Sequence, residues 1–401
     1  MNDLVIELLQ EIIEYLDRTA LVKFSSTCRR NRQVSSKFLW KTIILQPHSN
    51  IIDHNTVKEK YTYPQILFTN TTNFITDHKH VLPYIKEVIT IGCYDKHNIK
   101  LTSMTNLLAA CHNLQAIIHN WDPRTVFTGC QMETFTKTLL QLQHLSYINL
   151  HGDIWTYLNS FKLNTSPWHS LEVICSYNVQ CTFPISLINN GKLKRVICEN
   201  PSASQLEQLN MLKSVFNLEV IVTHTSEDPI ILQNTNPLLY IRILTLNFVY
   251  SRNLSVPIIN APNINALKLI RAKLMPQYVV SVYIENHMLG HISKVKCLYL
   301  INISYLTRVA FLAVEKVTLD CTDFDTYDEH KLLTSAPICF PNARILILHV
   351  NLPRIFPELD FRKCQNLERV VVKGRVSVND LLQFGLPCMK ICKNGVYLLT
   401  K

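Results

Sequence analysis

A short apolar pattern recurs along most of the chain. It consists of a leucine-like residue, two intervening residues, an aliphatic residue, one further residue and often another apolar residue. Alternating apolar positions of this kind are typical of β-strands that turn one face toward a core. The pattern begins 19 to 31 residues apart at Leu114, Leu145, Leu171, Leu193, Leu218, Ile241, Ile264, Val295, Val314, Ala343 and Leu367.

The spacing of this pattern limits the possible folds. It resembles that of leucine-rich repeats, in which each repeat has one strand and a helical or looser return segment. Stacked repeats form a parallel sheet whose alternate residues enter a shared core. A doubly wound sheet is the rival, but such folds usually carry a glycine-rich phosphate loop, and this chain has eight glycines and no such loop. We therefore expect an α/β fold with an irregular leucine-rich-repeat solenoid and a curved parallel sheet over residues 81–374, followed by a C-terminal cap over residues 375–401.

Two details refine this expectation. Ser204 and Glu207 have the spacing of a capping box, which predicts a helix in one return segment. In the cap we expect a helix near Val378–Phe384 and a strand near Val396–Leu399.

The N-terminal segment has a different period. Its apolar residues recur at helical spacing. A helix this apolar must pack on the residues that follow it or on a partner. The apolar residues at helical spacing are Val5, Leu8, Leu9, Ile12, Ile13 and Leu16.

The segment resembles an F-box. The matching positions are Leu4, Glu7, Leu8, Leu9, Ile12, Tyr15, Leu16, Asp17, Leu21, Phe24, Cys28, Arg29, Arg30, Leu39 and Trp40. It departs from the family pattern at Val5, where proline is usual, and at Asn31, where an aromatic residue often stands. The resemblance implies a three-helix F-box over residues 1–45. The polar residues 46–80 are expected to form a linker or irregular loop.

An F-box followed by such repeats resembles the substrate receptors of cullin–RING ubiquitin ligases. The resemblance implies that the F-box docks a Skp-family adaptor, and through it cullin and RING subunits, while the chain itself is not an enzyme. Candidates for adaptor contact are Leu4, Val5, Leu8, Leu9, Ile12, Leu16, Leu21 and Trp40. The alternative is that several of these residues only hold the three helices together.

The repeat surface is expected to bind a protein target of unknown identity. The candidates are the outward strand positions, and a slip of one residue would exchange core and surface. They are Asn149, His151, Glu199, Thr245, Asn247, Lys268, Tyr299, Asp320, His349 and Lys373. Trp121, Trp155 and Trp168 are either binding anchors or core residues, and core packing is the better interpretation.

Catalytic and metal-site motifs are missing from the sequence. We find no phosphate-binding glycine loop, nucleophile elbow or paired-histidine zinc helix, so we expect no cofactor and no metal. The thirteen cysteines are odd in number, and Asp3 and Glu7 lie where a secretory signal would be basic, which together favour reduced thiols in the cytoplasm or nucleus. No apolar run is long enough to span a membrane.

Two other functional classes stay open. The net charge of +10 permits nucleic acid as a partner, although the basic residues are spread out and we do not expect it. One alternative is a scaffold outside ubiquitination, similar to the F-box and leucine-rich-repeat subunit of the fungal centromere-binding complex. The other is a plain repeat interaction module, or an enzyme whose site we do not recognise.

Overall fold

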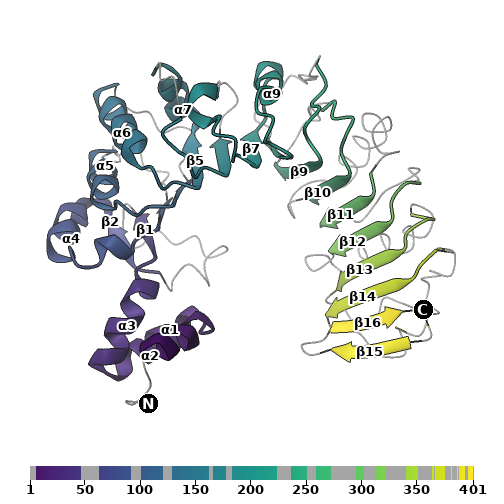
Figure 1. The fold of residues 1–401 in the computed structure, drawn as a ribbon, viewed down its shortest axis with the longest axis horizontal. Coiled ribbons are helices and arrows are strands. Elements are labelled where there is room, and N and C mark those ends of the chain that lie inside the picture. The colour runs from purple at the N-terminus through teal and green to yellow at the C-terminus, as the bar shows by residue number, and fades with distance from the viewer. Residues whose placement is uncertain are drawn as a thin grey trace. The chain divides into compact units, whose positions relative to one another are not determined.

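The computed structural model divides into two compact units, Met1–Leu193 (unit 1) and Lys194–Lys401 (unit 2), shown in Figure 1. Unit 1 is described over residues 6–46, 63–91, 101–120, 129–161, 166–177 and 183–193. Unit 2 is described over residues 194–223, 236–250, 259–271, 295–301, 312–320, 340–350, 364, 366–374, 381, 386, 388–392 and 396–400.

Unit 1 begins with three helices, as the resemblance to an F-box implies. They are α1 (Ile6–Glu14), α2 (Arg18–Thr27) and α3 (Arg29–Leu39). Asp17 lies between α1 and α2 and is the N-cap of α2. Its Oδ1 accepts a hydrogen bond from the backbone amide of Ala20 at 2.8 Å.

A parallel sheet follows in unit 1. Its strands lie in the order β2-β1-β3-β4-β5-β6. Their bounds are β1 (Thr42–Gln46), β2 (Gln65–Leu67), β3 (Glu87–Ile91), β4 (Ala116–Asn120), β5 (Tyr147–His151) and β6 (Val173–Tyr177). The connecting helices are η2 (Phe68–Asn70), α4 (Thr71–Asp77), η3 (Leu82–Tyr84), α5 (Leu101–Ala110), α6 (Gly129–Gln141), α7 (Gly152–Asn159) and α8 (Ile185–Ile188).

The structure differs from the expectation that residues 46–80 form a linker or irregular loop. Within residues 46–80, the described part contains β2 and α4, so this range is not only a linker or irregular loop. Strand β2 pairs in parallel with β1 and buries Ile66, and α4 buries Phe74. The polar composition of the range concealed these elements because each of them depends on very few buried apolar side chains.

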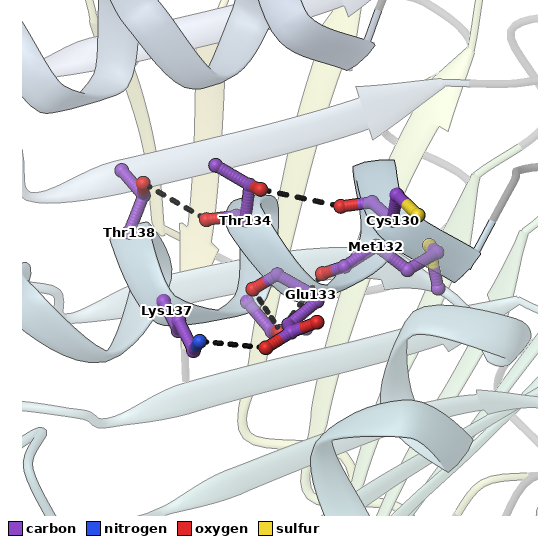
Figure 2. Close-up of polar contacts among 7 residues, drawn as sticks. Cys130, Met132, Glu133, Thr134, Lys137 and Thr138 are labelled. Atoms are coloured by element: carbon purple, nitrogen blue, oxygen red, sulfur yellow. Dashed lines mark hydrogen bonds and ion pairs between the residues drawn. The ribbon is translucent and has the colours of Figure 1, made fainter.

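Helix α6 contains several threonines, which are poor helix formers, and their hydroxyls bond back to carbonyls of the preceding turn (Figure 2). Thr134 donates to the Cys130 carbonyl at 3.2 Å, and Thr138 donates to the Thr134 carbonyl at 3.1 Å. On the exposed side, Lys137 Nζ lies 2.6 Å from Glu133 Oε1. This pair lowers the pKa of the Glu133 carboxyl by hydrogen bonding and by charge attraction.

Unit 2 continues the repeating strands. Its parallel strands run from β7 to β14 in chain order. They are β7 (Arg195–Glu199), β8 (Asn217–Thr223), β9 (Ile243–Tyr250), β10 (Ala266–Arg271), β11 (Cys297–Ile301), β12 (Lys316–Asp320), β13 (Ile345–Val350) and β14 (Arg369–Gly374). The fold class is therefore confirmed as α/β, with N-terminal helices followed by a long sheet of solenoid-like repeats.

Strand alternation divides each strand of unit 2 into two faces. Leu298 and Leu300 of β11 are fully buried, whereas Tyr299 between them is partly exposed. We call the side that carries Tyr299 the open face. One repeat begins three residues before the position expected from the sequence. Val215, not Leu218, is its leading residue, and Leu218 is the first inward residue of β8. Ile221 therefore lies on the open face. Leu218 and Val220 alternate like an ordinary strand, which hid this offset of three residues.

Asparagines join successive turns of the repeat. Asn263 Nδ2 donates to the Leu239 carbonyl at 2.9 Å, and Asn342 Nδ2 donates to the Leu312 carbonyl at 2.9 Å. In unit 1, Asn113 makes the equivalent bond to Pro83 at 3.0 Å. Each bond satisfies a carbonyl of the preceding turn, so it couples one repeat to the next.

The expected helix in the return segment before β8 exists, but its cap lies two residues earlier. Helix α9 (Ala203–Leu209) has Ser202 as its N-cap and Gln205 as the reciprocal partner. The backbone N–H of Gln205 donates to Ser202 Oγ at 3.2 Å, and the backbone N–H of Ser202 donates to Gln205 Oε1 at 2.7 Å. The predicted pair Ser204 and Glu207 is therefore wrong, although it has the same spacing.

The sheet of unit 2 ends in a change of direction. Strand β16 (Val396–Thr400) pairs antiparallel with β14, and β15 (Cys388–Cys392) pairs antiparallel with β16. The strand expected near Val396–Leu399 is confirmed. The helix expected near Val378–Phe384 lies outside the described residues except at Leu381.

Candidate functional site

The N-terminal helices enclose a small core. Leu9 and Ile13 of α1, Leu21 of α2 and Val34 of α3 are buried together. Partly buried side chains pack around them: Leu16, Phe24, Phe38 and Leu39. This core uses one stripe of α1 and leaves Ile6, Leu8 and Ile12 about half exposed.

The second stripe of α1 faces outward. Leu8 is 45% exposed, Ile12 is 43% exposed and Tyr15, just after the helix, is 89% exposed. These positions are spaced by four and three residues, so they lie on one side of the helix. Val22 of α2 adds a further exposed aliphatic side chain. We call Leu8, Ile12 and Tyr15 the outer stripe, and its composition is that of an interaction surface.

The structure divides the predicted adaptor contacts into two groups. Leu8 and Ile12 belong to the outer stripe, whereas Leu9 and Leu21 are 1% and 5% exposed and support it from inside. Leu16 packs against the core. Leu4 and Val5 lie outside the described residues. For Leu9 and Leu21 the burial favours the alternative that they hold the helices together.

Asn31 is compatible with the fold despite its departure from the family pattern. Its side chain is buried, and its Nδ2 donates to Thr27 Oγ1 at 2.8 Å. The backbone amide of Asn31 donates to Cys28 Sγ at 3.4 Å, so Cys28 acts as the N-cap of α3. A hydrogen bond between α2 and α3 thus replaces the apolar contact that an aromatic side chain would make.

Trp40 connects the helices to the sheet of unit 1. Its ring centroid lies 5.8 Å from that of Phe74 and 5.8 Å from that of His78, both at α4. Its amide donates to the Ser36 carbonyl at 3.0 Å and ends α3. Sequence reasoning assigned Trp40 to the adaptor and missed this contact, because α4 falls in the range expected to be a linker.

The predicted target-binding residues of unit 2 all lie on the open face. The register pairs Thr245 with Lys268 and then with Tyr299, in one row across β9, β10 and β11. A second row contains Asp320, His349 and Lys373 on β12, β13 and β14. Glu199 of β7 pairs with Ile221 of β8, which pairs with Asn247 of β9, so Glu199 and Asn247 also lie in the second row. The strand register inferred from the sequence is thus confirmed for these positions.

Position on the open face does not guarantee exposure. Thr245 is 5% exposed, and Asn149 of β5 in unit 1 is 2% exposed. Nothing is described of the His151 side chain, although the residue pairs with Tyr177 in register. Asn149 and Thr245 are therefore poor contact candidates unless their neighbours move.

Charged residues form cross-strand pairs on and beside the open face. His349 Nδ1 lies 3.3 Å from Asp320 Oδ2. Just before the strands, Arg344 donates twice to Glu368 at 3.0 Å. Hydrogen bonding and the Glu368 charge raise the pKa of the Arg344 guanidinium above its ordinary value. The Arg344–Glu368 pair is exposed, so it contributes little to stability, whereas the His349–Asp320 pair is partly buried.

Two tryptophans and four of the described cysteines, Cys111, Cys175, Cys198 and Cys364, are buried in the core. Trp155 and Trp168 are fully buried and donate from Nε1 to the Cys175 and Leu139 carbonyls, at 3.1 and 3.0 Å, which confirms their core role. Trp121 lies outside the described residues. Burial raises the pKa of the Cys111 thiol to about 12 and that of Cys364 to about 11. Among the described residues, the cysteines that form no disulfide bond are Cys28, Cys111, Cys130, Cys175, Cys198, Cys297 and Cys364.

Searches for other kinds of site are negative within the described ranges. No group of three or more His, Cys, Asp or Glu side chains there could hold a metal ion. Across that same part of the chain, every helix is too short or too polar to cross a membrane.

Comparison with known proteins identifies the N-terminal module. No curated protein matches the chain. The F-box-like family model matches residues 6–46, which comprise the three helices and β1. F-box domains in general bind a Skp-type adaptor. The match coincides with the buried core and the outer stripe, and residues 6–46 are therefore an F-box-like domain.

Proposed function

We propose that the chain is the substrate-recognition subunit of a Skp–cullin–F-box ubiquitin ligase. In this proposal the outer stripe docks the Skp adaptor, and the open face of a leucine-rich-repeat-like sheet binds a target protein. The chain contributes proximity between the target and the catalytic subunits, and no chemistry of its own. We further propose that it acts in the cytoplasm or nucleus.

The observation that carries the proposal is the outer stripe within the F-box-like domain. Leu8 and Ile12 are nearly half exposed on a helix whose other stripe already fills a core. Exposed leucine and isoleucine side chains gain free energy when a partner covers them, at about 25 cal/mol per Å² of apolar surface. An apolar groove on an adaptor would provide that cover.

Co-purification tests the proposal. Full-length chain is expressed with an affinity tag and isolated at moderate salt, and the retained proteins are identified. We expect the Skp adaptor and a cullin together. Failure to recover the adaptor would contradict the whole proposal.

The net charge of +10 is compatible with one alternative, a scaffold that binds DNA outside ubiquitination. The same preparation distinguishes the two. Recovery of the adaptor without a cullin, together with DNA that is released by salt, would support the scaffold. Recovery of the cullin, with salt-independent retention of the target, would support the ligase.

A further inference from the structure

Positive charge is concentrated on one part of the open face. Over strands β10 to β14 the register places four basic side chains on this face and a single carboxylate, Asp320. Asp320 already pairs with His349 at 3.3 Å. The four basic residues are Lys268, Lys316, Arg369 and Lys373.

The neighbouring strands of unit 2 differ in charge. On the open face of β7 to β9, Arg195 pairs with Glu219, and Glu199 adds a second carboxylate. The sign of the face therefore changes between β9 and β10. This localisation indicates a partner that places negative charge over β10 to β14 rather than a general attraction to anions.

Aliphatic side chains separate the basic ones. Ile345 lies between Lys316 and Arg369 in one row of the register. In the next row Ile347 and Val371 are neighbours across β13 and β14. A nucleic-acid backbone is dominated by charged phosphates, which cover aliphatic side chains poorly. A protein segment with both acidic and aliphatic residues matches both kinds of position.

Tyr299 and Thr318 are neighbours in the middle row of this face. The Thr318 Oγ1 atom is buried and makes no hydrogen bond within the part of the chain that the structure describes. Beside it in the same row, Tyr299 presents its ring to Lys316 Nζ at 6.0 Å. The Tyr299 ring and the Lys316 ammonium group therefore present an apolar and a basic position side by side, as the aliphatic and basic residues of the other rows do.

From these observations we infer that the open face of β10 to β14, termed the basic face, binds an acidic segment of a protein that also carries aliphatic side chains. The inference rests on the proposed function, because it names the chemical class of the target. The basic face spans four strand spacings, about 19 Å, which an extended segment of about six residues covers.

A peptide-binding experiment tests the inference. The probe is a fluorescein-labelled pool of short peptides built from Asp, Glu, Leu and Ile, and binding to the full chain is measured by fluorescence anisotropy. A pool with Lys and Arg in place of the acidic residues is the first control. Random-sequence duplex DNA is the second.

Matched variants locate the binding. Lys316→Glu combined with Arg369→Glu reverses two charges on the basic face. Lys192→Glu combined with Lys213→Glu makes the same change in net charge at exposed lysines outside that face. We expect the first pair to weaken binding of the acidic pool by about tenfold or more, and the second to change it by about twofold or less.

Several outcomes would overturn the inference: no binding of the acidic pool, equal binding of the basic pool, or equal loss with both variant pairs. Stronger binding of duplex DNA that depends on Lys316 and Arg369 would assign the face to nucleic acid instead. Adaptor and cullin retention is scored on the same preparations. Acidic-pool binding without the adaptor would leave the inference standing and remove the ligase, and the reverse result would remove only the inference.

Discussion

Replacement of Leu8 by aspartate tests the outer stripe directly. Full burial of a leucine side chain is worth about 1.5–3 kcal/mol, so the 45% that is still exposed leaves about 1 kcal/mol to be gained from a partner. Leu8→Asp removes this gain and places a carboxylate in an apolar contact, which costs at least about 2 kcal/mol more. The sum, about 3 kcal/mol, predicts that adaptor affinity falls by about 100-fold or more.

The same substitution should leave the domain folded. Leu8 lies outside the buried core, and exposed substitutions usually change stability by less than about 1 kcal/mol. The assay is adaptor binding by isothermal titration calorimetry, with circular dichroism to confirm the helices. Gln33→Asp, which adds the same charge at an exposed position of α3, is the matched control and should bind normally. Wild-type affinity for Leu8→Asp would refute docking through the outer stripe.

Three further predictions follow from other parts of the structure. Leu9→Ala should destabilise the N-terminal domain by about 2–5 kcal/mol, seen as loss of helicity at lower urea, and an unchanged urea midpoint would contradict the core assignment. Asn342→Ala should lower the stability of unit 2 by about 1 kcal/mol in the same assay, because the Leu312 carbonyl loses its donor. Burial raises the pKa of the Cys111 thiol to about 12, so at pH 8 iodoacetamide should label exposed Cys130 and spare Cys111 until the chain is unfolded; equal labelling rates in the native protein would refute this.

Strand register was predictable because the side-chain period of a strand is two residues. Once Leu298 and Leu300 are recognised as inward, Tyr299 must face the other way, and Asp320 and His349 follow by the same rule. The failure at Leu218 has the same origin. Leu218 and Val220 alternate with their neighbours whether the repeat begins at Val215 or at Leu218. The sequence alone therefore offers two equivalent starting positions for this repeat.

Features that depend on tertiary contacts could not be predicted in the same way. Whether Ser202 or Ser204 caps α9 depends on where the chain leaves β7, since both have a glutamine or glutamate three residues on. The contact of Trp40 with Phe74 joins elements separated by a polar segment. The helical period identified α1 but could not say which of its two apolar stripes turns inward, because that depends on how α2 and α3 pack against it.

The division of the chain at Leu193 has a genetic consequence. The F-box-like domain lies wholly in unit 1, whereas the basic face lies wholly in unit 2. A substitution in unit 2 changes no residue of the outer stripe. If the proposed function holds, such a chain still occupies the adaptor and delivers no target, so it competes with the normal protein. Missense alleles in unit 2 are then dominant when overexpressed, and truncating alleles that also remove the outer stripe are recessive.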